Sequence, residues 1–182
     1  MRIASRHMPE YKPRPTGLVA WAFLVALACG IVYVAVSSPA GAVVALVLLG
    51  ASYLFARRAA KRDEMRLRTI AAERQGESIC EFAQDFDTRT VDTWIIRAVY
   101  EQIQRQLDHV HSAFPLRASD RLKEDLQLDD DDLDMDIAVQ IEQRTSRSLD
   151  LTKANPYFGK VKTLRDLVMF FQAQPLCRLT KA

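Results

Sequence analysis

Two long apolar runs near the start of the chain distinguish it from the more polar remainder. Residues 17–36 and residues 39–56 contain no charged side chain. Because an α-helix rises 1.5 Å per residue, about 20 residues give a length of roughly 30 Å, which matches the hydrocarbon core of a bilayer. The pattern therefore predicts a transmembrane hairpin with spans 17–36 and 39–56, preceded by a basic arm, 1–16.

The connection between the runs consists of Ser37 and Ser38 only, so the two helices should be antiparallel neighbours. The small residues Gly41, Ala42 and Ala45 form a strip where the first helix can approach the second closely. A signal peptide and a buried hairpin of a soluble protein are the alternative interpretations. The first run is long for a signal peptide, and a second apolar run comes directly after it.

Basic residues flank the hairpin on both sides, whereas the turn between the spans carries no charge. These residues are Lys12, Arg14, Arg57, Arg58, Lys61 and Arg62. The positive-inside rule then places both ends of the chain in the cytoplasm. Residues 57–76 are rich in helix formers and should continue the second span as a charged helical linker. This linker could bind anionic headgroups or serve as a plain solvated spacer.

Apolar residues recur at helical spacing from residue 77 onward. A short strap, 77–90, carries Phe82 and Phe86 on one face and should pack on the domain C-terminal to it. Cys80 lies between Ile79 and Phe82 on the apolar side of the strap. The pattern therefore predicts that the Cys80 thiol is buried.

The first two helices of the C-terminal domain have clear start signals. One begins at the N-cap Asp92 and ends near His109. The next opens after an acidic turn, 129–132, whose carboxylates suit a helix N-terminus, and it ends near Arg147. Their predicted buried faces contain Ile96, Tyr100, Ile103 and Leu107 in the first helix, and Leu133, Ile137 and Ile141 in the second.

A last helix completes the domain, which spans residues 91–174 and precedes a tail, 175–182. Thr163 and Asp166 form a capping box at its start. Its predicted buried face contains Leu164, Leu167, Val168 and Phe171. No segment alternates apolar and polar residues with a period of two over a useful length. The predicted fold class is therefore all-α.

The formal net charge of +2 hides an uneven distribution. Residues from Gln75 on hold 14 basic and 19 acidic side chains, a balance of −5, so the domain lacks the basic face that a nucleic acid needs. The cysteines, Cys29, Cys80 and Cys177, have no metal-binding or disulfide spacing and are expected to be free thiols. There is no glycine-rich phosphate loop. We therefore expect no enzymatic activity, no metal, no cofactor and no small-molecule substrate.

The order of elements between Val91 and Gln172 resembles that of acyl carrier proteins. Both have a helix, a long loop, an acidic turn, a second helix, an irregular connection and a short helix opened by threonine. In that family an Asp-Ser-Leu motif opens the second helix, and its serine carries phosphopantetheine. Here the matching residues are Asp131-Asp132-Leu133. Asp132 then occupies the serine position, and a shift by one residue would place Asp131 there.

A carboxylate cannot form the phosphodiester that a serine hydroxyl forms, so the resemblance implies the shape of a carrier without its prosthetic group. The chain also resembles bacterial proteins of unknown function that carry an acyl-carrier-like domain, some with membrane spans, and lack the serine. This second resemblance implies a location in the bacterial inner membrane, with the spans in the bilayer and the domain in the cytoplasm.

In acyl carrier proteins the acidic second helix docks on basic patches of partner enzymes. The resemblance assigns that role here to Asp130, Asp131, Asp132, Asp134, Asp136 and Glu142. A merely solvated acidic cap is the simpler interpretation. The expected function is a membrane-tethered, non-enzymatic module that docks a protein with a basic patch. The alternative is a small subunit of a membrane transport or envelope-assembly complex whose hairpin makes the main contacts.

Overall fold

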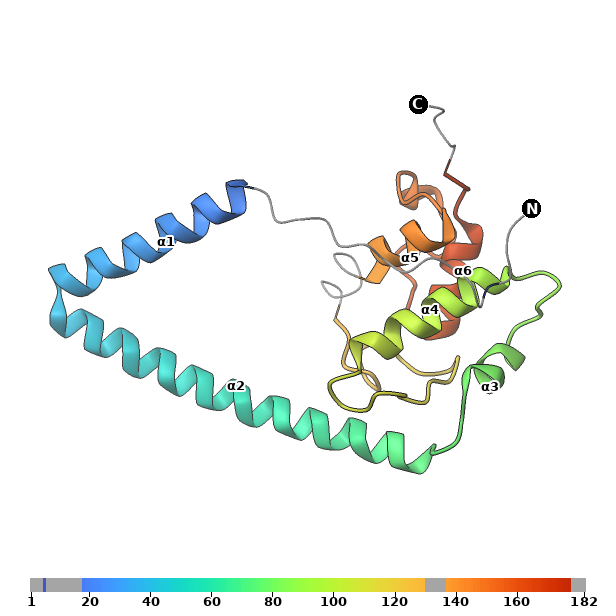
Figure 1. The fold of residues 1–182 in the computed structure, drawn as a ribbon, viewed down its shortest axis with the longest axis horizontal. Coiled ribbons are helices and arrows are strands. Elements are labelled where there is room, and N and C mark those ends of the chain that lie inside the picture. Colours follow the sequence, from blue (N-terminus) through green and yellow to red (C-terminus); the bar gives the residue numbers. More distant parts are fainter. Residues whose placement is uncertain (1–4, 6–17, 130–136, 178–182) are drawn as a thin grey trace. The chain divides into compact units, whose positions relative to one another are not determined.

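The chain is mostly helical in the computed structural model, which describes residues 5, 18–129 and 137–177 (Figure 1). The helices are α1 (Leu18–Ser37), α2 (Pro39–Glu73), α3 (Ile79–Gln84), α4 (Thr93–Gln106), α5 (Ala138–Thr145) and α6 (Leu164–Ala173), with a 3₁₀ turn at Thr152–Ala154. The described residues include no strand, which agrees with the all-α prediction. They fall into two compact units, one ending at Asp63 and the other starting at Glu64.

The first unit contains the apolar helices. By length and composition, one helix of the described residues, Ala40–Glu73, is long and apolar enough to cross a membrane. In α1 the described apolar stretch, Trp21–Tyr33, is shorter. The two-span hairpin therefore stays a prediction.

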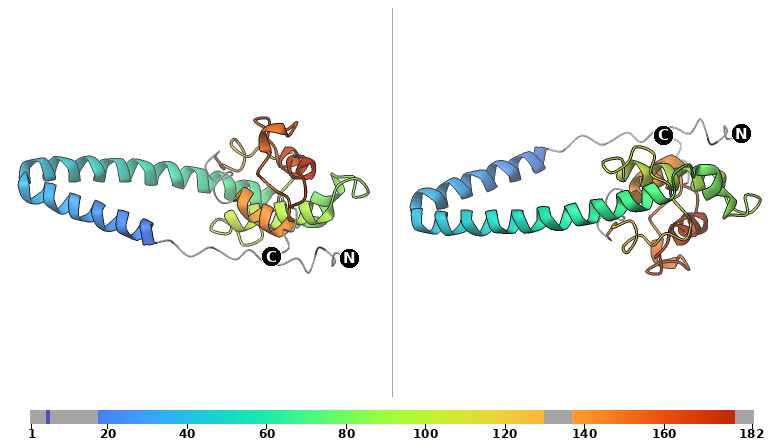
Figure 2. Two further views of the ribbon diagram at one scale, coloured as in Figure 1. Left: turned by 90° about the horizontal axis from the view of Figure 1, so that it is seen from above. Right: turned by 90° about the horizontal axis from the view of Figure 1, so that it is seen from below.

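α1 and the start of α2 run in opposite directions from Ser38 (Figure 2) and open away from each other (Figure 1). The close approach predicted along the small-residue strip stays a prediction. Contact between apolar helices gains no hydrophobic free energy when lipid can cover both. At the start of α2 the Ser38 hydroxyl oxygen accepts the Gly41 N–H. A Cβ on residue 41 would lie 2.9 Å from that oxygen, so glycine leaves room for this contact.

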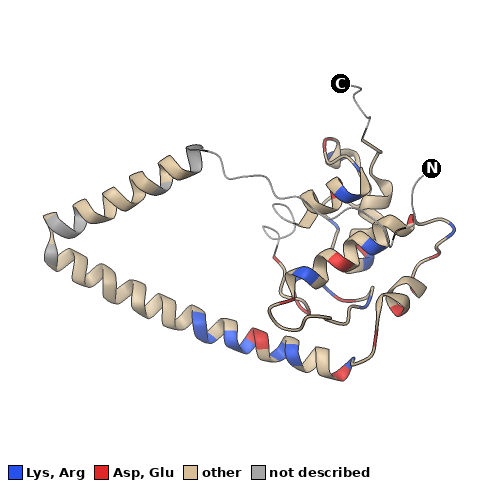
Figure 3. Cartoon of the chain, viewed as in Figure 1, with Lys and Arg blue, Asp and Glu red and all other residues tan. Residues whose placement is uncertain are grey.

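α2 continues without a break from its apolar part into its charged part, as the sequence predicts, and its charged side chains lie in its C-terminal half (Figure 3). Arg68 pairs with Glu64 one turn earlier, at 2.6 Å. Leu67 and Ala71 are 4% and 5% exposed and belong to the hydrophobic core of the second unit, where Ile70 packs against them. The end of α2 is therefore a core element and not a plain solvated spacer.

The short strap packs on the domain through its aromatic residues, as predicted. The Phe82 ring centroid lies 5.3 Å from that of Phe86 and 5.3 Å from that of Tyr100 on α4. Ser78 and Glu81 form a capping box that starts α3. The prediction for Cys80 is wrong, since its side chain is exposed. α3 has only six residues, and Phe82 alone of them is fully buried.

α4 and α6 match their predicted starts and buried faces, and α4 ends at Gln106, three residues before the predicted end near His109. The Asp92 carboxylate accepts the Trp94 N–H, and the Thr163–Asp166 capping box is formed. All eight residues predicted for their core faces are buried. Both α5 and α6 pack on α4, which lies at the centre of the domain. Each apolar side chain buried there stabilises the fold by about 1.5–3 kcal/mol.

α5 differs from its prediction at its C-terminal end. Ile137 and Ile141 are fully buried, as expected, whereas Leu133 lies outside the described residues. The helix ends at Thr145 because Ser146 adopts a left-handed conformation with φ of 56°. Arg147 therefore lies beyond the helix and not in its last turn.

Candidate functional site

The predicted docking surface lies largely outside the described part of the chain. Outside it are Asp130, Asp131, Asp132, Asp134 and Asp136, and with them both candidates for the carrier-serine position. The sixth residue, Glu142, is half-buried on α5, and its carboxylate accepts the backbone N–H of Leu149 at 3.0 Å. Glu142 thus fastens the chain after α5 to the helix, in addition to any role toward a partner.

The described residues on both sides of the acidic segment are anchored in the core. Leu128 is 4% exposed, and its N–H donates to the Leu122 carbonyl at 2.8 Å. Ile137, on the other side, is fully buried. The core therefore fixes the points where the acidic segment begins and ends.

A buried carboxylate joins three parts of the domain just before that segment. The Asp120 side chain, 2% exposed, accepts a hydrogen bond from the Arg74 guanidinium at 2.7 Å and from the Arg117 backbone N–H at 2.8 Å. The Asp120 carbonyl accepts the N–H of Leu164 at 3.0 Å. Asp120 thereby connects the residue after α2, the loop after α4 and the start of α6.

Two further ion pairs surround this junction. Arg117 forms a bidentate pair with Glu77, which lowers the pKa of Glu77 and raises that of Arg117. Hydrogen bonds from Arg121 lower the pKa of Asp125, and the guanidinium of Arg66 on α2 lies 3.9 Å from the same carboxylate. Both carboxylates are therefore ionised at neutral pH and stay paired.

A second polar cluster ties the three main helices of the domain together. Glu101 on α4 pairs with Arg97 on the same helix and with the buried guanidinium of Arg144 on α5. Arg147 donates to the Gln174 carbonyl at 2.7 Å and lies 3.8 Å from the Asp92 carboxylate. These contacts hold the residues that follow α5 against the start of α4 and the end of α6.

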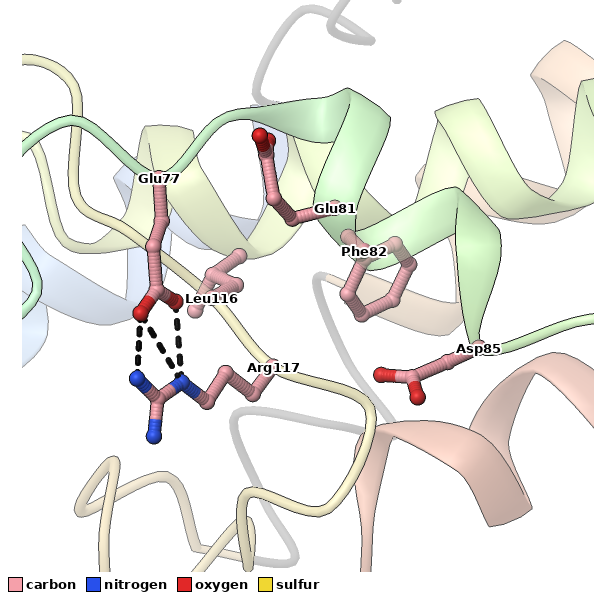
Figure 4. Close-up of a pocket in the computed structure, with 6 residues that line it drawn as sticks. All are labelled: Glu77, Glu81, Phe82, Asp85, Leu116 and Arg117. Carbon is pink, nitrogen blue, oxygen red and sulfur yellow. Dashed lines mark hydrogen bonds and ion pairs between the residues drawn. The ribbon is translucent and has the colours of Figure 1, made fainter.

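A pocket of about 230 Å³ lies beside α3 and is lined by Glu77, Glu81, Phe82, Asp85, Leu116 and Arg117 (Figure 4). In Figure 4 the paired Glu77 and Arg117 lie on one side of the pocket and Asp85 on the other, with Phe82 between them.

The carboxylates of this pocket all have structural partners. Glu77 is held by Arg117, and Glu81 accepts both the N–H and the hydroxyl of Ser78. The hydrogen bonds from Ser78 lower the pKa of Glu81. Asp85 lies 3.6 Å from the guanidinium of Arg165. A general acid or base needs a pKa near the working pH, whereas the pKa values of Glu77 and Glu81 are lowered, so these two paired carboxylates have structural roles.

Sequence reasoning missed the residues of the two polar clusters. Arg74 and Asp120 are 46 positions apart, and Glu101 and Arg144 are 43 apart, so no local pattern pairs them. The one local signal is that Arg144 follows the buried Ile141 by three positions and so shares its helix face. Comparison of the chain with protein-family models, with curated proteins and with solved structures found no match.

Proposed function

We propose that the chain is a membrane-tethered, non-enzymatic interaction module. Its helical domain resembles an acyl carrier protein without the prosthetic group, and it docks a partner protein through the acidic segment 130–142. The chain crosses a bacterial inner membrane twice, as a hairpin, and both of its ends are cytoplasmic. The partner presents a basic patch, because six carboxylates attract one by charge complementarity.

The main support for this proposal is that α2 combines an apolar part with a part that packs in the core of the domain. Its first part is an uncharged apolar helix, and its last part contributes Leu67 and Ala71 to the core of the domain. Membrane helix and domain are thus joined by one continuous element. Tethering to a membrane raises the local concentration of the domain near membrane-bound partners, so weak docking suffices.

The order of elements also supports an acyl-carrier-like domain. After α4 come a long loop, the acidic segment, α5, a 3₁₀ turn and α6, whose first turn is capped by Thr163. This is the order that the resemblance implies. Leu122, Leu126 and Leu128 of the long loop are all buried, so the second half of the loop is packed onto the bundle.

Reversing the charge of the acidic segment should abolish docking. In the triple variant Asp131→Lys, Asp132→Lys and Asp134→Lys, like charges face each other across the interface, which costs several kcal/mol. Recovery of the partner with the tagged full chain, measured by quantitative mass spectrometry from solubilised membranes, should fall to background.

The matched control reverses three exposed acidic residues elsewhere, Glu73, Asp108 and Glu124, and so changes the net charge by the same amount. This control should recover the partner normally. Equal recovery by both triple variants would remove the docking mechanism. Exchange of the hairpin for an unrelated one distinguishes docking through the acidic segment from the alternative function. A subunit that binds through its spans would lose its partner after this exchange and would keep it in the triple Lys variant.

A further inference from the structure

The loop between α5 and α6 exposes apolar and basic side chains together. Within residues 151–162 there are three lysines, Lys153, Lys160 and Lys162, and no acidic residue. Leu151 is 65% exposed and Phe158 is 50% exposed. Single exposed apolar residues are common, whereas a leucine and a phenylalanine set among lysines are typical of surfaces that bind at a membrane interface.

The loop is folded, so its exposed side chains are held outside the core. Asn155, which is 9% exposed, donates to the Phe170 carbonyl on α6 at 2.9 Å and accepts the Tyr157 N–H at 2.9 Å. Backbone turns hold the residues on both sides, since the Ala154 N–H donates to the Leu151 carbonyl and the Phe158 N–H to that of Asn155. Asn155 thus fixes the loop on α6 while Leu151 and Phe158 stay in solvent.

The loop has a net positive charge. Among the described residues, none of the three lysines forms an ion pair. The nearest acidic residues along the chain accept hydrogen bonds from uncharged groups, Asp150 from the Ser148 hydroxyl at 2.8 Å and Asp166 from the Thr163 N–H. Residues 151–162 therefore carry a formal charge of +3 around two exposed apolar side chains.

We propose that this loop binds the surface of an anionic phospholipid bilayer. The lysine ammonium groups contact lipid phosphates, and the side chains of Leu151 and Phe158 enter the boundary between headgroups and acyl chains. The inference rests on the proposed membrane tether, which keeps a bilayer within reach of every copy of the domain. It assigns the domain a lipid contact of its own, separate from the acidic segment that docks a partner protein.

A fluorescent probe on the loop tests the proposal in the full chain. The variant Phe158→Cys, with Cys29→Ser, Cys80→Ser and Cys177→Ser, is labelled with an environment-sensitive nitrobenzoxadiazole dye and reconstituted into lipid nanodiscs. The control keeps the exposed Cys80 as the single labelled thiol, with Cys29→Ser and Cys177→Ser. Nanodiscs of phosphatidylcholine alone are compared with nanodiscs that contain phosphatidylglycerol.

The dye at position 158 should emit more strongly and at shorter wavelength in the anionic nanodiscs, and the dye on Cys80 should not change. Each lysine near an anionic surface contributes about 1 kcal/mol, which is about fivefold in the binding equilibrium. The triple variant Lys153→Gln, Lys160→Gln and Lys162→Gln should therefore weaken loop binding by about 100-fold and abolish the change.

Three results would overturn the proposal in chains that incorporate into nanodiscs: equal emission from position 158 in both lipids, an equal change at Cys80, or an unchanged response after the lysine substitutions. A loop that responds only when a protein partner is added would also overturn it. Failure of the chain to incorporate into nanodiscs would instead contradict the membrane tether, so the two failures are distinguishable.

Discussion

Replacement of Asp120 by alanine should destabilise the helical domain by about 3–5 kcal/mol, because it leaves the charge of Arg74, whose side chain is only 16% exposed, without its partner. The Arg117 backbone N–H loses its acceptor in the same variant. Hydrogen exchange of the most protected α4 amides in the full chain reports this free energy. The exchange rates should rise by more than about 100-fold, since each 1.4 kcal/mol corresponds to a factor of ten.

Two further variants show how much of the loss comes from the charge of Asp120 and how much from its hydrogen bonds. Asp120→Asn keeps an oxygen that can accept the Arg117 N–H, so it should destabilise the domain less than Asp120→Ala. Glu124→Ala removes an exposed carboxylate nearby and should change the free energy of unfolding by no more than about 0.5 kcal/mol. Equal exchange rates in Asp120→Ala and Glu124→Ala would show that the buried pair does not hold the domain together.

Truncation of Leu67 to alanine should destabilise the same domain by about 2–5 kcal/mol. Leu67 is 4% exposed and belongs to the hydrophobic core, although it lies on the charged part of α2 between Arg66 and Arg68. The lost stability is the sum of the transfer free energy of the removed carbons and the free-energy cost of the cavity that they leave. Hydrogen exchange in α4 and α6, both of which lie well beyond Leu67 in the chain, is the measurement.

The control for this prediction lies two residues away on the same helix. Met65 is 62% exposed, so Met65→Ala removes a side chain of similar size without opening a cavity in the core. Its exchange rates should match those of the unsubstituted chain. If Leu67→Ala also matched them, the end of α2 would be a spacer outside the domain.

Local patterns in the sequence predicted most of the domain. The i, i+4, i+7 spacing from Ile96 to Leu107 and the Thr163–Asp166 capping box each involve residues within a few turns of one another, and the structure confirms both. Such patterns depend on helix geometry alone, so they can be recognised before any tertiary contact is known.

Tertiary contacts account for what the sequence did not reveal. Leu67 stands between two arginines, and the burial of Leu67 and Ala71 depends on contacts with residues further along the chain. Cys80 is exposed because its short helix turns Phe82 inward. The docking surface was predicted from a resemblance, and of its six residues the structure describes Glu142, whose carboxylate also holds the Leu149 N–H.

The most direct test of a carrier-like domain without carrier chemistry is the intact mass of the full chain after incubation with a phosphopantetheinyl transferase and coenzyme A. We expect the unsubstituted chain to keep its mass, because neither Asp131 nor Asp132 offers a hydroxyl. We expect Asp131→Ser or Asp132→Ser to gain the mass of one phosphopantetheine. A gain of that mass by the unsubstituted chain would contradict the account.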